Sequence, residues 1–119
     1  MIYDDIYTTL NGDGVVSSLV KDLTQVKFRE EPNLPAVRFQ KISSVPVGGL
    51  KQEHTNGYAR VTIDVIDHSL SKCEEVSEAI KDAMASATFQ NFKDNESDAY
   101  EKETRLYMVT MDYLIFTCT

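Results

Sequence analysis

The chain has 119 residues, 42% of them hydrophobic and 26% charged, a composition typical of a globular protein, and we expect a single domain over residues 1–119. Its 12 basic residues against 19 acidic ones give a net charge of −7, which argues against a protein that grips nucleic-acid phosphates. There is no apolar run of the roughly 18 residues that a membrane helix needs, and the first residues are acidic rather than basic, so we expect a protein made in the cytoplasm without a membrane span or signal peptide.

Two short helices are predicted at the start of the chain. The first has an apolar stripe at helical spacing, formed by Ile2, Ile6 and Leu10. The segment 11–14 (Asn-Gly-Asp-Gly) then ends it, because glycine and asparagine favour turns. A second helix should run from about residue 15 to residue 22, with Asp13 as its N-cap. We expect its core-facing residues to be Val15, Val16, Leu19, Val20 and Leu23.

Three strands are predicted next. Residues 26–29 alternate between apolar and basic side chains and suggest a short strand. After a loop that contains two prolines, residues 36–44 alternate again. Residues 58–66 give the clearest strand pattern of the chain, with one apolar and one polar face. The apolar face consists of Ala59, Val61, Ile63 and Val65, and the polar face of Arg60, Thr62 and Asp64.

The strongest helix prediction covers residues 70–85. Ser71 and Glu74 have the spacing of a capping box, unless the helix starts slightly earlier, at Ser69. The predicted buried stripe is Leu70, Cys73, Val76, Ile80, Ala83 and Met84. Residues 88–92 suggest a further short strand, and residues 94–103 are so rich in acids that we expect a solvated loop there.

The last segment, residues 104–117, is a long strand candidate with two unequal faces. Tyr107, Val109, Met111, Tyr113 and Ile115 make one face wholly apolar or aromatic, and the other face turns apolar at its end. Such a strand must be central in a sheet or covered by a partner, or the chain would aggregate. Together the patterns predict an α+β fold with an antiparallel or mixed four-stranded sheet and helices packed on one face.

The connection between the second and third strands is the segment with the best claim to an interaction role. Residues 45–57 are longer than an ordinary hairpin loop and contain a Gly-Gly and an Asn-Gly pair. We predict a partner interface there, formed by Val47, Gly48, Gly49, Leu50, Lys51, Gln52 and Glu53.

Few residues of the chain are candidates for catalysis or metal binding. Asp67 and His68 sit where a strand gives way to a helix, and a small cytoplasmic α+β enzyme using this pair is one alternative, although no nucleophile or base pattern accompanies them. His54, His68, Cys73 and Cys118 match no zinc spacing. We therefore predict no catalytic residue, no cofactor and no metal site.

Several segments in the right order resemble the tail-completion family of long-tailed bacteriophages, whose members are also called tail terminators or head–tail joining proteins. They are the first helix with its glycine-rich break, the stretch 34–44 (Leu-Pro-Ala-Val-Arg-Phe-Gln-Lys-Ile-Ser-Ser), the strand from Arg60 to Val65, the helix near 70–84 and the stretch 103–113. The resemblance covers nearly the whole chain.

This resemblance implies a structural virion protein and no enzyme. It implies a homo-oligomeric ring, usually hexameric, that caps the tail tube, stops its polymerisation and offers a joining surface to the head connector. Such a protein would be assembled in the host cytoplasm and lie at the head-proximal end of the tail, with DNA passing through the ring unbound, which suits a net charge of −7. A head-closure protein or a minor tail protein is the alternative within the same class.

Overall fold

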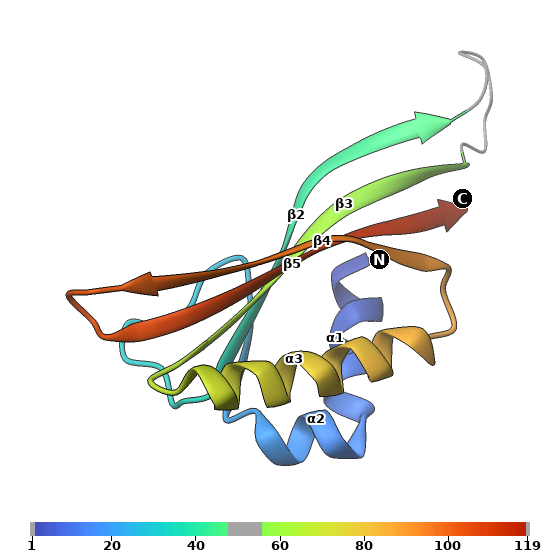
Figure 1. The fold of residues 1–119 in the computed structure, drawn as a ribbon. Helices are drawn as coiled ribbons and strands as arrows, with labels where there is room; N and C mark the ends of the chain where they lie inside the picture. Colours follow the sequence, from blue (N-terminus) through green and yellow to red (C-terminus); the bar gives the residue numbers. More distant parts are fainter. Residues whose placement is uncertain (1, 48–55, 119) are drawn as a thin grey trace.

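The computed structural model describes residues 2–47 and 56–118 of the chain. Their elements follow in the order α1 (Ile2–Gly12), α2 (Gly14–Leu19), β1 (Asp22–Gln25), β2 (Ala36–Val47), β3 (Asn56–Asp67), α3 (Leu70–Ala85), β4 (Asn91–Glu101) and β5 (Leu106–Cys118). Figure 1 shows a twisted sheet with the three helices gathered on one side of it, α3 running along the strands. The α+β class predicted from the sequence is confirmed.

The strands form one mixed sheet in the order β1-β2-β3-β5-β4. β1 and β2 are parallel, and every other neighbouring pair is antiparallel. The prediction of an antiparallel or mixed sheet is therefore confirmed, but the predicted number of four strands is wrong, because the described residues form five. β5 is an inner strand, held between β3 and β4, as expected from the apolar side chains on both of its faces.

The core lies between the helices and one face of the sheet. On that face, alternate residues of β3 and β5 are at most 3% exposed: Ala59, Val61, Ile63, Val65, Val109, Met111, Tyr113 and Ile115. Opposite them, α1 contributes Ile6 and Leu10, and α3 contributes the predicted stripe, of which Leu70 alone is only partly buried. The period-2 and period-3.6 patterns thus meet as predicted.

Helices α2 and α3 each begin with a side-chain cap. The Asp13 carboxylate accepts hydrogen bonds from the N–H groups of Val15 and Val16, each at 3.0 Å, as predicted for an N-cap. The cap of α3 is Ser69, whose hydroxyl accepts from the N–H of Lys72. The earlier of the two predicted starts is therefore the correct one, and Ser71 lies inside the helix.

Three predictions near the N-terminus are wrong. The second helix, expected to reach about residue 22, ends at Leu19. Val15 does not face the core but is 59% exposed, because α2 has only six residues and buries Val16 alone. The first strand is β1 at Asp22–Gln25, not residues 26–29. Val26 has a φ of 72°, a left-handed backbone conformation that ends the strand and turns the chain away from the sheet edge.

The acid-rich segment is the largest correction. Residues 94–103, expected as a solvated loop, mostly belong to β4, which pairs with β5 from Asn91 to Glu101. Of the short strand expected at residues 88–92, only residues 91 and 92 are in a strand, as the first two residues of β4. Nearly all of β4 is exposed, so no apolar alternation marks it in the sequence. Backbone pairing along β5 forms the strand, and its charged side chains remain in water.

Candidate interaction surfaces

The interface predicted from the sequence lies where β2 is followed by β3. Val47, the last residue of β2, pairs with Asn56, the first residue of β3, so the two strands stay paired up to the base of the connection. The other predicted residues, Gly48, Gly49, Leu50, Lys51, Gln52 and Glu53, lie outside the described residues. A partner contact at this segment remains a prediction.

Asp67 and His68 lie at the junction of β3 and α3, where each is bonded to the backbone. The Asp67 carboxylate accepts a hydrogen bond of 2.8 Å from the N–H of Ser69, and His68 Nδ1 donates to the carbonyl oxygen of Arg105 at 3.0 Å. These bonds fix the start of α3 and tie it to the turn before β5. Both side chains therefore have a structural explanation. The described residues contain no group of three or more His, Cys, Asp or Glu side chains that could hold a metal ion.

Cys73 is a buried residue of α3, and its thiol lies 3.5 Å from the carbonyl oxygen of Tyr107. Burial, followed by the charge of Asp67, raises the pKa of this thiol to about 11. It stays protonated at neutral pH, and a protonated thiol is a poor nucleophile and metal ligand. The side chain of Cys118 is outside what the structure describes.

The face of the sheet that carries no helix is organised around a buried ion pair. Asp64 on β3 is 3% exposed, and one of its oxygens accepts from Arg38 Nε at 3.0 Å and from Arg38 Nη2. The other oxygen accepts from the Thr110 hydroxyl of β5 at 2.7 Å. The centroid of the Phe28 ring lies 4.9 Å from the Arg38 guanidinium carbon. Both oxygens of the buried carboxylate are thus satisfied, which is what makes its burial tolerable.

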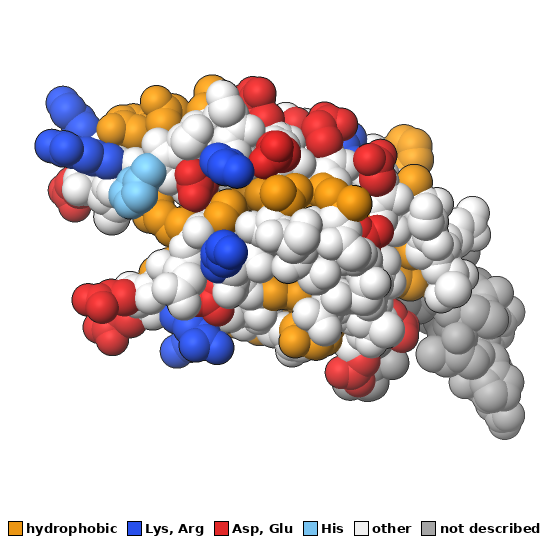
Figure 2. All heavy atoms as spheres, turned by 90° about the horizontal axis from the view of Figure 1, so that it is seen from below, with side chains coloured by type: hydrophobic (Ala, Val, Ile, Leu, Met, Phe, Trp, Pro, Cys, Tyr) orange, Lys and Arg blue, Asp and Glu red, His pale blue; other side chains and the backbone are white. Residues whose placement is uncertain are grey.

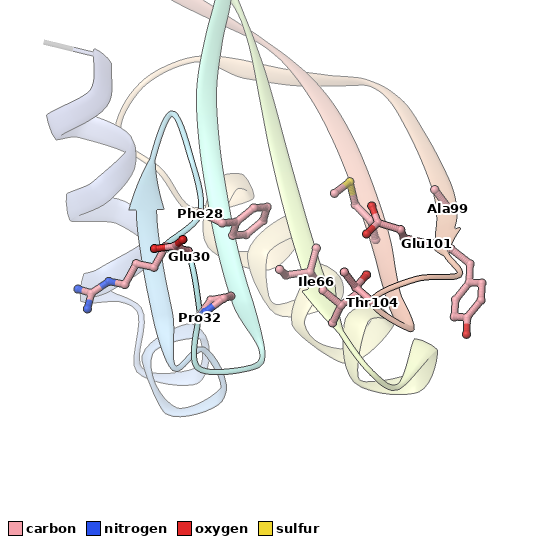
Figure 3. Close-up of a pocket in the computed structure, with 11 residues that line it drawn as sticks. Phe28, Glu30, Pro32, Ile66, Ala99, Glu101 and Thr104 are labelled. Carbon is pink, nitrogen blue, oxygen red and sulfur yellow. The ribbon is translucent and has the colours of Figure 1, made fainter.

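A groove of about 560 Å³ opens beside this ion pair, on the same face of the sheet. Its floor contains Ile66 of β3 and Met108 of β5, and Figure 3 shows Phe28 on one side of it and Ala99 on the other. Glu101 also lines it. The groove exists because residues 26–35 fold over the sheet opposite the β4–β5 hairpin. Its apolar floor and polar rim suit an inserted apolar side chain more than a charged small molecule.

The outer strand β4 is fixed to the helix layer by a small ionic network. Glu96 lies 2.9 Å from Lys81 of α3 and 2.9 Å from Lys93, and Lys81 also contacts Glu78 at 2.9 Å. The hydrogen bonds that Lys81 and Lys93 donate to Glu96 lower the pKa of its carboxyl group, and the hydrogen bonds that Lys81 donates to Glu96 and Glu78 raise the pKa of Lys81. On the other face of the sheet, Arg60 of β3 pairs with Asp94 at 2.9 Å.

On the helix side of the molecule, the described basic side chains form no concentrated patch of the kind that binds a polyanion (Figure 2). On the helix side of the molecule, seen in Figure 2, basic side chains lie in small separate groups among acidic ones. This distribution agrees with the argument from net charge that the protein does not grip nucleic-acid phosphates. Among the described residues, no helix is long and apolar enough to cross a membrane.

Sequence reasoning missed both the groove and the edge strand. The groove depends on how residues 26–35 fold back over the sheet, and no periodic pattern encodes that path. For β4, the one usable signal was a pair of aromatic residues in an otherwise polar stretch, Phe92 and Tyr100. Tyr100 indeed packs on Tyr107, with ring centroids 4.7 Å apart.

Comparison with known proteins identifies a family and solved structures of similar fold. No curated protein matches the chain. A solved structure described as "Virion of native gene transfer agent (GTA) particle" contains a chain with a TM-score of 0.69 and 11% sequence identity, matched over 96% of this chain and 92% of that one. At this identity the likeness concerns the fold. The family model described as "Tail completion protein gp17" matches residues 4–117, from α1 to the end of β5. The chain therefore belongs to the tail completion protein gp17 family of structural phage tail proteins.

Proposed function

We propose that the protein forms a homo-oligomeric ring, hexameric as the family resemblance implies, that caps the tail tube, stops its polymerisation and provides the joining surface for the head connector. The observation that carries this proposal is the match of the tail completion family to residues 4–117, which spans every element of the fold rather than one motif. In this role residues 1–119 act as one domain. It would lie at the head-proximal end of the tail after assembly in the host cytoplasm.

The shape of the subunit supports a joining role. The described part of the molecule measures 49 × 29 × 23 Å. In Figure 1 the β4–β5 hairpin and the paired ends of β2 and β3 point to opposite ends of the molecule, with the helices between them. A subunit elongated in this way can contact one component at each end. We propose that the end with the β2–β3 connection touches the tail tube or a neighbouring subunit through Val47 and residues 48–53.

Electrostatics support a conduit through which DNA passes. With a net charge of −7 the subunit would repel rather than retain phosphates, and a channel that retained DNA would hinder its ejection. The enzyme alternative is disfavoured by the backbone bonds that occupy Asp67 and His68. A head-closure protein or minor tail protein remains the rival within the virion.

The test is to delete the gene from the phage that encodes it and to examine the lysate by electron microscopy. We expect full heads and separate tails, many of them of uncontrolled length, and restoration of joined particles when the purified protein is added. Heads that lose their DNA beside tails of normal length would favour the head-closure alternative. Normal infectious particles without the gene would refute the proposal.

The proposed contact at the β2–β3 connection has its own test. Because Val47 and Asn56 are paired, residues 48–55 can be replaced by an Asn-Gly turn that closes the hairpin, and this leaves every buried residue of the described core in place. We expect the shortened protein to unfold at the same temperature as the wild type but to fail in the add-back experiment. If it restores joined particles fully, the connection has no part in assembly.

A further inference from the structure

The groove on the helix-free face of the sheet has an apolar floor and an acidic rim. Of the residues that line it, Arg29, Glu30 and Glu101 are charged. The Arg29 guanidinium is paired with Asp22 at 3.0 Å. Glu30 and Glu101 form no ion pair with another described residue, and they lie on opposite sides of the groove (Figure 3). The groove therefore suits an apolar side chain that brings a positive charge with it.

An apolar side chain of this kind is exposed on β2. The register of β2 against β3 shifts between Lys41 and Ser43, so Ile42 is the extra residue of a β-bulge and has no partner on β3. Its side chain is 56% exposed. Lys41, directly before it, is exposed and forms no ion pair among the described residues. Ile42 is thus an apolar knob with a positive charge beside it.

We propose that Ile42 of one copy of the chain enters the groove of the next copy, where Lys41 meets the rim carboxylates Glu30 and Glu101. This proposal rests on the proposed function, since it supplies the contact that repeats around the ring. The knob and the groove are different surfaces of one subunit, so joining them gives the head-to-tail contact from which rings are built. The apolar stem of Lys41 can lie along the groove while its ammonium group reaches a carboxylate.

Ile42 cannot reach the groove of its own subunit. It lies level with Arg60 and Val61 of β3, whereas the floor of the groove contains Ile66. Five residues of extended strand separate Val61 from Ile66 by about 17 Å. The knob must therefore enter another molecule.

Among the exposed apolar side chains, Ile42 is the one that fits both the apolar and the charge requirement from a separate surface. The described residues include seven large apolar side chains that are exposed: Tyr7, Val15, Val26, Ile42, Phe92, Tyr100 and Phe116. Only Val26 and Ile42 adjoin a basic residue without an ion pair in the described chain, Lys27 and Lys41. Val26 belongs to the segment that walls the groove, so its insertion would join like surfaces and close a dimer instead of continuing a ring.

The first experiment tests the contact by crosslinking. The full chain with Ile42→Cys and Ala99→Cys carries one thiol on the knob and one on the groove, and Cys118→Ser leaves only the buried Cys73 besides them. A short bismaleimide is added to the purified protein and to tails that the protein has capped. We expect a ladder of covalent oligomers on a denaturing gel, ending at the complete ring. Val15→Cys with Ala99→Cys, at an exposed apolar position without a neighbouring lysine, is the matched control and should give no ladder.

Crosslinks within one subunit do not compete with this ladder. β2 and β4 lie three strand spacings apart in the sheet, which is about 14 Å. Ala99 is also level with Ile66, about 17 Å along the strands from the position of Ile42. The two thiols of one subunit are therefore too far apart for a short crosslinker.

The second experiment tests the charges through the joining of heads and tails. Lys41→Glu alone, and Glu30→Lys with Glu101→Lys, each bring like charges together at every contact of the ring. We expect each variant to lower the yield of joined particles about tenfold or more in the add-back experiment. The variant with all three changes has opposite charges at every contact again and should recover most of the wild-type yield. Lys21→Glu changes an exposed lysine that neither lines the groove nor adjoins Ile42, and should behave as wild type.

The outcomes separate this contact from the proposed function. If the double-cysteine variant, folded by circular dichroism, gives no more ladder than its control in either sample, Ile42 does not occupy the groove and the contact is wrong. If only the groove variants lose joining, or the triple variant fails as its parents do, the groove holds another virion component and the contact is again wrong. If wild-type protein does not restore joining, the proposed function fails, and the ladder from purified protein alone decides the contact.

Discussion

The two faces of β3 and β5 are built from alternating residues of the same strands, yet they are stabilised by different interactions. The face under the helices is a continuous apolar surface, with Val61, Ile63 and Met111 fully buried. The other face holds a buried ion pair, Arg38–Asp64, beside an open groove. One face therefore stabilises the fold by excluding water. The other face is held by specific polar contacts, and the groove beside them stays open to solvent.

The sharpest way to break this contrast is to place a charge on the covered face. Ile63→Asp would bury an unpaired carboxylate in the centre of the core, at a cost of several kcal/mol against a total stability of roughly 5–15 kcal/mol. We expect the variant to be unfolded by circular dichroism at room temperature. Ser43→Asp, on an exposed part of β2 opposite Arg60, is the matched control and should fold normally. A soluble Ile63→Asp protein with cooperative unfolding would show that the core is assigned wrongly.

On the open face, removing one partner of the ion pair should be the next most damaging change. Asp64→Ala leaves the Arg38 guanidinium and the Thr110 hydroxyl without their acceptor. Because Arg38 is 27% exposed and can recover some hydration, we expect a loss of about 2–3 kcal/mol in urea unfolding, below the value for a fully buried pair.

The double variant Arg38→Met with Asp64→Leu provides the control for that loss. It replaces both charges with apolar groups of similar size, and we expect it to recover most of the lost stability. Recovery would show that the open face tolerates apolar residues, whereas the covered face does not tolerate charges. If the double variant is as unstable as Asp64→Ala, the pair contributes through more than charge compensation.

The loop that bounds the groove offers a stabilising change. Val26 is half-exposed and adopts a φ of 72°, which a β-branched residue accepts only with strain. Asparagine tolerates this conformation far better, so Val26→Asn should raise stability by about 1 kcal/mol and the melting temperature by a few degrees. Val26→Ile, which keeps the strain, serves as the comparison in calorimetry. A lower melting temperature for Val26→Asn would show that the valine side chain contributes more than its backbone costs.

The smallest expected effect concerns Glu96 and its dependence on pH. In the folded protein the pKa of Glu96 is lowered from its ordinary value of 4.5. Its pairing with Lys81 and Lys93 therefore stabilises the fold fully at pH values above 4.5, and this stabilisation is lost as the pH falls through the lowered pKa. Because these groups are partly exposed, we expect Glu96→Gln to cost only about 0.5 kcal/mol near pH 7. The difference from wild type should shrink as the pH falls below 4.5 and vanish once Glu96 is protonated in the folded protein, as measured by urea unfolding at each pH. A difference that persists at low pH would point to a structural effect of the substitution.

The covered face was predictable because burial imposes a period on the sequence. The alternation from Ala59 to Val65 and the stripe of α3 are enough to identify most of the core. The edge strand β4 was not predictable, because with both sides in water it has no apolar period, and its pairing comes from the backbone of β5. The Arg38–Asp64 pair depends on the register of β2 against β3. Sequence alone placed both residues on polar faces but could not bring them together.

The buried thiol of Cys73 offers a kinetic view of the subunit. With its pKa at about 11 and the side chain fully buried, Cys73 reacts with an alkylating reagent only while α3 is lifted from the sheet. In a Cys118→Ser variant it is the last thiol in the chain, so the alkylation rate reports how often this helix opens. Measured on the free protein and again on particles, that rate would show how far incorporation into a virion restrains the motion.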